Sequence, residues 1–235
     1  MAMNINEKRI VFVDLDGTLI RTLNGNPHPK GVWDMHMDYE VMFKIGRMRP
    51  TAVFIVSNQG GIEKGYVNHR LFEQKFMYVI ASLQDICGQH VFVAGRYCPT
   101  MKDDDPMRKP NTGMLTAMLD EFQKLVQHTF RKEDCVMIGD MESDRQTAEN
   151  FGIDYIDAEA FCKEEVEEPL YRIVDATTGE DIPNQPHLNK KETLKAIEEL
   201  HKENPDKKYA YVTEKFICPP QPKPNRQQRR ANERA

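Results

Sequence analysis

Carboxylate side chains follow two apolar runs of this sequence. Asp14 and Asp16 end the run IVFVDLD, and Asp140 ends the run CVMIGD with Asp144 close behind. Clustered carboxylates repel one another unless a cation lies among them, and oxygen ligands with open positions suit Mg²⁺. We therefore expect these four acids to surround a Mg²⁺ site.

Further polar residues have a similar setting. Ser57 and Asn58 end the apolar run TAVFIVSN, and Lys109 in RKPNTGM stands just before an expected helix start. The Lys109 ammonium could neutralise both an attacking carboxylate and a bound phosphate, and a helix N-terminus adds N–H groups that favour anions. Taken alone, Ser57 and Asn58 are equally well explained as residues that end a strand.

The elements that must position these residues follow from the apolar pattern. Up to about residue 157, short runs rich in Val, Ile and Phe alternate with segments of helical periodicity. This alternation is typical of βα units, so we expect an α/β fold with a Rossmann-like parallel sheet and helices on both faces. Ligands bind at the carboxyl ends of such strands, which would bring the polar residues together.

The pattern changes near residue 169. We expect residues 1–168 to form the main domain and residues 169–214 a small β-β-α-β appendage, whose helix Asn189 would cap. Residues 215–235 are rich in Pro and then basic, which predicts a disordered tail.

The composition limits the class of protein. The 235 residues include 32 Lys+Arg and 37 Asp+Glu, a net charge of -5, so the whole chain has no field suited to sequence-blind nucleic-acid binding. No apolar stretch approaches the roughly 20 residues of a membrane span, and we expect a cytoplasmic protein. The five cysteines form no CxxC pair, which predicts reduced thiols and no complete structural zinc site.

Four motifs in this order resemble those of the haloacid dehalogenase (HAD) superfamily of phosphotransferases: DLDGT, a strand that ends in SNQ, RKP and GDMESD. The segments SNQGGIEKG and RKPNTGM are similar to the branch that contains polynucleotide 3'-phosphatases, histidinol-phosphate phosphatases and heptose-bisphosphate phosphatases. The resemblance covers roughly residues 8 to 160. Because the insertions between the motifs are short, it implies a HAD core with a minimal cap.

The resemblance also implies catalytic roles. Asp14 would be the nucleophile that forms an aspartyl-phosphate, and Asp16 the general acid that later activates water as a base. Ser57 and Asn58 would bind the phosphoryl oxygens, while Lys109 would neutralise charge in the transition state.

The remaining roles concern the metal and the substrate. Mg²⁺ would be bound by Asp14, Asp140 and the backbone carbonyl of Asp16, and Asp144 would lie in an outer shell, bind through water or cap the next helix. Gly17 and Thr18 would turn the backbone N–H groups toward phosphate, and Arg108 would contact a second phosphate or the leaving group. Pairing of Arg108 with the neighbouring acidic run explains that residue equally well.

The segment before RKP bears on the substrate. Members of this branch that act on small molecules commonly carry a zinc loop of Cys and His there, whereas this chain has Cys98 but Thr100 in place of the expected His. The missing zinc ligands favour the polynucleotide phosphatases. The acidic run KDDDP is unhelpful to a polyanionic strand, but a solvated loop without a role is the simpler explanation for it.

We therefore expect a Mg²⁺-dependent phosphomonoester hydrolase whose substrate is a polynucleotide 3'-phosphate or a nucleotide. One alternative is a phosphatase of small metabolites, such as a sugar phosphate or histidinol phosphate, and another is a non-catalytic binding module on the same fold. The sequence contains no GxxxxGK[ST] motif, so we expect no fused kinase. The expected partner is a phosphorylated substrate, with a nucleic-acid end among the candidates, and no membrane.

Overall fold

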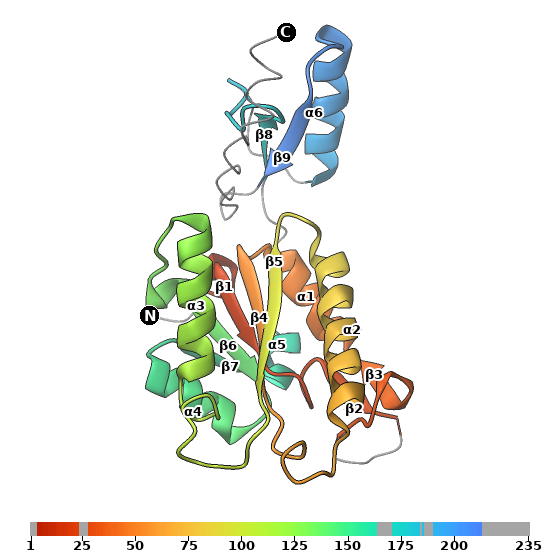
Figure 1. The fold of residues 1–235 in the computed structure, drawn as a ribbon. Helices are drawn as coiled ribbons and strands as arrows, with labels where there is room; N and C mark the ends of the chain where they lie inside the picture. The colour runs from red at the N-terminus through yellow and green to blue at the C-terminus, as the bar shows by residue number, and fades with distance from the viewer. Residues whose placement is uncertain (1–3, 24–27, 164–170, 184, 186–189, 213–235) are drawn as a thin grey trace, which may run out of the picture.

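The structure is a computed structural model that describes residues 4–23, 28–163, 171–183, 185 and 190–212. Its centre is a five-stranded sheet with the order β5-β4-β1-β6-β7, in which every neighbouring pair is parallel (Figure 1). The strands are β1 (Ile10–Val13), β4 (Ala52–Asn58), β5 (Phe92–Cys98), β6 (Cys135–Gly139) and β7 (Asp154–Asp157). The predicted Rossmann-like parallel sheet is thus confirmed.

Helices cover both faces of this sheet, as predicted (Figure 1). One face packs against α1 (Tyr39–Met48), α2 (His69–Cys87) and α5 (Ala158–Lys163). The other face packs against α3 (Gly113–Val126) and α4 (Glu142–Phe151). Short 3₁₀ helices lie at Ile5–Glu7, Val32–Asp34 and Lys132–Asp134.

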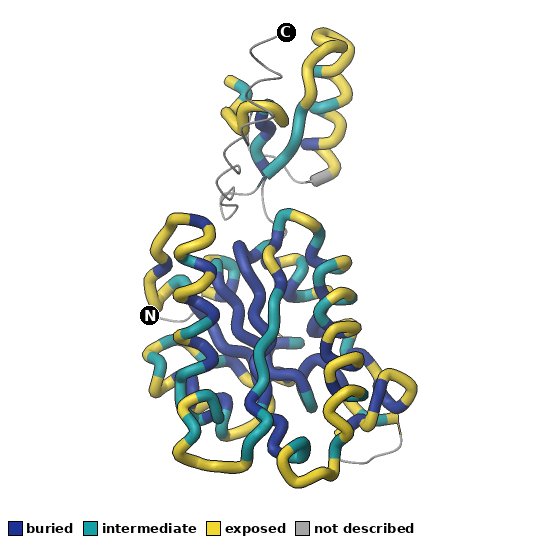
Figure 2. Tube along the Cα trace, viewed as in Figure 1, coloured by how far each residue is buried: buried dark blue, intermediate teal, exposed yellow. Residues whose placement is uncertain are grey.

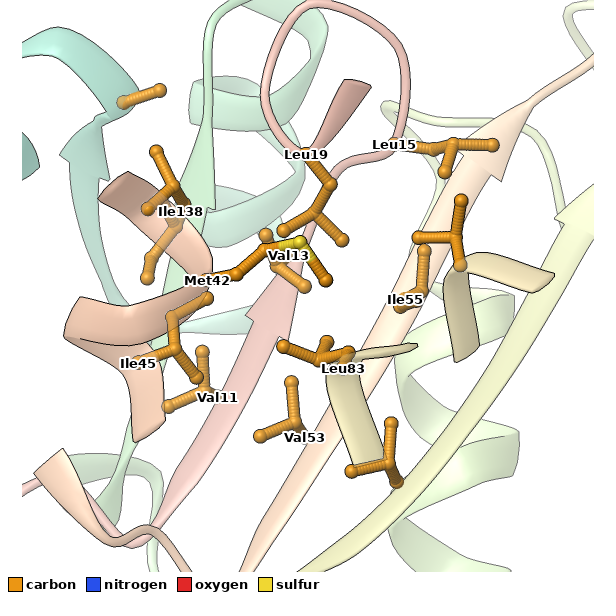
Figure 3. Packing of buried hydrophobic residues seen from close by; sticks show 14 of the residues in the cluster. Val11, Val13, Leu15, Leu19, Met42, Ile45, Val53, Ile55, Leu83 and Ile138 are labelled. Atoms are coloured by element: carbon orange, nitrogen blue, oxygen red, sulfur yellow. The ribbon is translucent and has the colours of Figure 1, made fainter. Parts of the chain in front are cut away.

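The middle strand β1 explains why the apolar runs are continuous. Val11 and Val13 point into the cluster under α1 and α2, while Ile10 and Phe12 point into the cluster under α3. Figure 3 shows the first cluster and Figure 2 the buried strands at the centre of the sheet. Each fully buried side chain of this kind contributes about 1.5–3 kcal/mol. The sheet is therefore a rigid mount for the residues at its strand ends.

A small hairpin follows β1. Its strands β2 (Ile20–Thr22) and β3 (Met35–Met37) pair antiparallel. Strands of three residues are too short to give an alternating pattern, so the sequence does not predict them.

The appendage contains β8 (Arg172–Asp175), α6 (Lys190–Glu203) and β9 (Tyr209–Val212), with β8 and β9 antiparallel. The expected second strand is only a bridge between Val174 and Asp181. The predicted cap Asn189 and tail 215–235 lie outside the described residues, and the domain boundaries remain predictions.

Arg49, at the end of α1, contacts the appendage. Its guanidinium carbon lies 4.9 Å from the ring centre of Tyr171 and 6.0 Å from that of Tyr211, and its Nε donates to the Tyr171 hydroxyl at 3.1 Å. Arg49 precedes β4, so the appendage contacts the main part of the chain beyond the amino ends of the sheet strands (Figure 1). No helix among the described residues is long and apolar enough to cross a membrane.

Candidate active site

The carboxyl ends of β1, β4 and β6 meet at a cleft of about 640 Å³. Several cleft residues end these strands or directly follow them. Asp14, for example, continues β1 and donates its backbone N–H to the Ile138 carbonyl of β6 at 2.9 Å. All of the predicted site residues except Thr18 line the cleft: Asp14, Asp16, Gly17, Ser57, Asn58, Arg108, Lys109, Asp140 and Asp144. The sheet thus brings together motifs that are far apart in the sequence.

Lys109 is the central cation of the cleft. Its Nζ donates to a carboxylate oxygen of Asp14, to Asp144 Oδ1 at 2.5 Å and to the Val56 carbonyl at 3.0 Å. The Lys109 and Asp144 side chains are 3% and 0% exposed, so neither could be buried in its charged form without such a partner. Burial disfavours the ammonium, but Asp14 and Asp144 outweigh it and raise the pKa of Lys109.

Three carboxylates surround the single ammonium of Lys109 in this part of the cleft. Asp14, Asp140 and Asp144 each offer an oxygen within 4.8 Å of the others. Burial raises the pKa of Asp14 to about 7, although the Lys109 charge opposes this shift, and burial also raises the pKa of Asp140. Asp14 and Asp144 are buried, whereas Asp140 is exposed at the cleft. Carboxylates that are this close together fit a divalent cation, because its charge would offset their repulsion.

Gly17 permits the acids to approach one another. Its φ of +94° is in the region that favours glycine, and a Cβ atom there would lie 2.1 Å from Asp140 Oδ2. The next residue, Thr18, donates its hydroxyl to Asp140 Oδ1 at 3.1 Å and is fully buried. The Thr18 side chain therefore orients a candidate metal ligand, and the turn of its backbone N–H toward phosphate stays a prediction.

Asp144 uses both of its oxygens within the protein. Besides the bond from Lys109, its Oδ2 accepts from the backbone N–H of Met141 at 3.1 Å, at the start of α4. This arrangement fits the capping role and the outer-shell role that the sequence left open, since neither oxygen is without a donor.

Asn58 also acts within the protein. Its Nδ2 donates to the Lys109 carbonyl at 2.8 Å and its Oδ1 accepts from the Lys109 N–H at 2.9 Å. The Asn58 side chain thus binds the main chain of Lys109, and its binding of phosphoryl oxygens stays a prediction.

Asp16 lies apart from the three clustered acids. Its Oδ2 accepts from Gln59 Nε2 at 2.5 Å and its Oδ1 from Lys75 Nζ at 3.2 Å. Gln59 also donates to Ser57 Oγ at 2.9 Å. Neither partner is evident from a motif, although a lysine within the apolar stripe of α2, next to Phe76, is an available signal.

The loop before Lys109 is held by hydrogen bonds. Asp105 accepts from the Thr100 hydroxyl at 2.8 Å and from the Met107 N–H at 2.9 Å, and these bonds lower the pKa of Asp105. Asn111 Nδ2 donates to the Asp105 carbonyl at 2.8 Å. The explanation of the acidic run as a solvated loop without a role is therefore wrong for Asp105, which organises the segment where a zinc loop would lie.

This loop presents Arg108 to the cleft. Its guanidinium donates to the Thr100 carbonyl at 2.9 Å, and its Nε lies 3.6 Å from Asp103, whose side chain is fully exposed. The pairing of Arg108 with the acidic run is thus present, and its contact with a second phosphate or the leaving group stays a prediction. Cys98 is buried, and its Sγ lies 3.5 Å from Thr100 Oγ1.

A model of the family described as polynucleotide kinase 3 phosphatase matches residues 9–211. The chain belongs to this family. The match begins just before β1 and ends within β9, so it takes in every cleft residue named above. The resemblance to HAD-superfamily phosphatases is thereby confirmed.

Three relatives of this polynucleotide kinase 3 phosphatase family member show similar identity. The histidine biosynthesis bifunctional protein HisB of Legionella pneumophila is 28% identical over 63% of this chain and 41% of that protein. The bifunctional polynucleotide phosphatase/kinase of Schizosaccharomyces pombe is 29% identical over 66% of this chain and 37% of that protein. A probable D-glycero-D-manno-heptose-1,7-bisphosphate 7-phosphatase of Thermoplasma acidophilum is 29% identical over 63% and 88%. The chain spans less than half the length of the two bifunctional relatives.

Proposed function

We propose that this protein is a Mg²⁺-dependent phosphomonoester hydrolase that works through an aspartyl-phosphate on Asp14. The observation that carries the proposal is the contact of Asp14 with Lys109 in the cleft. In the same cleft, carboxylate oxygens of Asp14, Asp140 and Asp144 lie within 4.8 Å of one another. A carboxylate held by a buried ammonium, next to further acids, is suited to attack a phosphate, because the ammonium and a metal bound by the acids would neutralise the phosphate charge.

The residues would act in two steps. An oxygen of Asp14 attacks phosphorus, the ester P–O bond breaks, and Asp16 gives its proton to the departing alkoxide. Asp16 then takes a proton from water, whose oxygen attacks phosphorus and releases Asp14 and inorganic phosphate. Lys109 and the Ser57 hydroxyl would bind phosphoryl oxygens throughout.

Asp14, Asp140 and the backbone carbonyl of Asp16 would hold the metal. When bound, Mg²⁺ would offset the negative charge of the phosphoryl group and of the carboxylates around it. Asp144 would keep Lys109 in place, because both of its oxygens are already hydrogen-bonded.

The favoured substrate is a polynucleotide 3'-phosphate or a nucleotide. The family match and the fission yeast relative support it. The contact of Arg49 with Tyr171 lies beyond the opposite end of the sheet from the cleft. The described part of the appendage therefore leaves the cleft accessible to the 3' end of a polynucleotide. Arg108 at the rim offers a guanidinium for a second phosphate.

A small phosphorylated metabolite is the second candidate. Asp103 places an exposed carboxylate at the rim, where it would repel a polyanion, and the Thermoplasma relative is matched over 88% of its length. This alternative predicts the same chemistry with a different leaving group.

The test is Mg²⁺-dependent release of phosphate from a 3'-phosphorylated oligonucleotide. The same oligonucleotide with a 5'-phosphate is the matched control for the end, a panel of nucleotides and sugar phosphates tests the alternative, and Asp14→Asn is the blank. Preference for the 3'-phosphate supports an end-processing enzyme, whereas preference for a sugar phosphate supports the second candidate. Release that persists in Asp14→Asn would contradict the mechanism, and no release from any substrate would support a binding module.

A further inference from the structure

Lys75 is a buried cation that the proposed reaction leaves without a role. It lies on α2, its side chain is 1% exposed, and its ammonium is 5.2 Å from the ring centre of Phe72. Removing a charged ammonium from water is unfavourable unless partners compensate it. An apolar side chain at this position in the stripe of α2 would avoid the desolvation free energy of the ammonium, so the contacts of the ammonium need an explanation.

The ammonium has two oxygen partners. Its Nζ lies 3.2 Å from Asp16 Oδ1 and 3.1 Å from the Pro29 carbonyl. Pro29 belongs to the connection between β2 and β3, and its neighbour His28 lines the cleft. Lys75 thus links one face of α2 to the Asp16 carboxyl and to the hairpin beside the cleft.

The two oxygens of Asp16 receive donors from different elements. Gln59, just after β4, donates to Oδ2 at 2.5 Å, and Lys75 on α2 donates to Oδ1. Two donors in fixed positions hold the plane of a carboxyl group, which otherwise rotates freely about its terminal torsion. The buried residues Phe72, Phe76 and Val79 fix α2 in turn, so the Lys75 donor is on a rigid support.

We propose that Lys75 is a positioning residue that holds the Asp16 carboxyl in the orientation from which it protonates the leaving group. The inference rests on the proposed function, in which Asp16 is the general acid. Its contribution should depend on how much the leaving group needs a proton. A sugar alkoxide is a poor leaving group and needs one, whereas p-nitrophenolate departs without it.

The experiment compares wild type with Lys75→Met on a 3'-phosphorylated nucleotide substrate and on p-nitrophenyl phosphate. The parameter is kcat/KM, because it covers the steps up to departure of the leaving group and excludes hydrolysis of the aspartyl-phosphate, which both substrates share. We expect kcat/KM to fall at least about tenfold for the alkyl ester, a part of the 10²–10⁴ that general acids supply, and to change less than about twofold for the aryl ester.

Lys8→Met is the matched control. Lys8 is also buried, pairs with the Asp154 carboxylate and donates to the Glu133 carbonyl at 2.6 Å, at the amino end of β1 away from the cleft. This variant loses a buried ammonium in the same way, and kcat/KM should remain within about twofold for both esters. Should Lys75→Met fail to fold, Lys75→Gln, which keeps an N–H donor, is compared instead, and its loss must still be greater for the alkyl ester.

The outcomes separate this inference from the proposed function. Equal losses for the two esters, or no loss for either, in a variant of an active enzyme would overturn the positioning role alone. A wild-type protein that is inactive on both esters would overturn the proposed function and this inference with it.

Discussion

Asn58 and Lys109 exchange two hydrogen bonds, of 2.8 and 2.9 Å, between residues that are 51 positions apart in the sequence. The side-chain amide of Asn58 bonds the N–H and the carbonyl of Lys109, much as a neighbouring strand would. The end of β4 thereby fixes the backbone from which the Lys109 ammonium reaches Asp14. This finding gives Asn58 a role in supporting Lys109, the proposed catalytic cation.

Asn58→Ala should therefore lower kcat more than it raises KM. Without the amide, the backbone of Lys109 loses both hydrogen bonds to Asn58, and a displacement of about 1 Å in a catalytic group can cost up to about 100-fold in rate. Steady-state kinetics with the best substrate of the panel provide the measurement. A rise in KM at unchanged kcat would instead show that Asn58 binds substrate.

The control for this variant is Asn150→Ala. Asn150 donates to the Pro110 carbonyl at 3.0 Å, next to Lys109, but is exposed and makes this contact from α4. Its removal should leave kcat within about twofold, because exposed single hydrogen bonds contribute little.

The sequence predicted the fold because the strands are buried on both faces. Runs such as residues 10–13 and 135–139 are apolar throughout, and the helices between them carry clear stripes, so element type and sheet class could be derived. The hairpin β2–β3 could not, since its strands have three residues each, and the second strand of the appendage proved to be only a bridge.

The site was predicted at the level of motifs rather than partners. The ends of β1 and β6 place Asp14 and Asp140 together, and the loop before α3 brings Lys109 to Asp14. No local pattern shows that Lys75 meets Asp16, because the two residues are 59 positions apart and their contact depends on how α2 packs on the sheet. The bond from Thr100 to Asp105 spans only five positions, but it depends on a loop conformation that the residue types do not indicate.

Thr18→Val should weaken Mg²⁺ activation. The change keeps the volume but removes the hydroxyl that donates to Asp140 Oδ1, and loss of such an outer partner typically costs about 10- to 100-fold in metal affinity. The measurement is the Mg²⁺ concentration at half-maximal activity after treatment with EDTA. Thr147→Val is the matched control, because this buried hydroxyl binds the Ser143 carbonyl, and its activation should be unchanged.

Two thiols should resist alkylation in the folded protein. Burial raises the pKa of Cys87 and of Cys135 to about 12, so the reactive thiolate is scarce at pH 8 and appears only as the pH rises toward that value. Mass spectrometry after iodoacetamide treatment should show Cys162, which is partly exposed, modified before either. Equal rates in native and urea-unfolded protein would contradict the burial of Cys87 and Cys135.

Asp105→Ala should raise KM with little change in kcat. The variant removes the acceptor for Thr100 and for the Met107 N–H, so the loop no longer fixes the Thr100 carbonyl that binds Arg108 at the rim. Lys109 keeps its own bonds to Asn58 and Asp14, which is why the chemical step should persist.

Asp104→Ala controls for the charge, since Asp104 is the exposed acid next to Asp105 in the same loop. Kinetics of wild type and of both variants should also be insensitive to 1,10-phenanthroline in the presence of Mg²⁺. Thr100 stands where a zinc-binding His would be expected, and Thr100 and the Met107 N–H both donate hydrogen bonds to Asp105. If the chelator inactivates the enzyme, or if Asp104→Ala raises KM as much as Asp105→Ala does, the hydrogen bonds of Asp105 are not what shapes the rim.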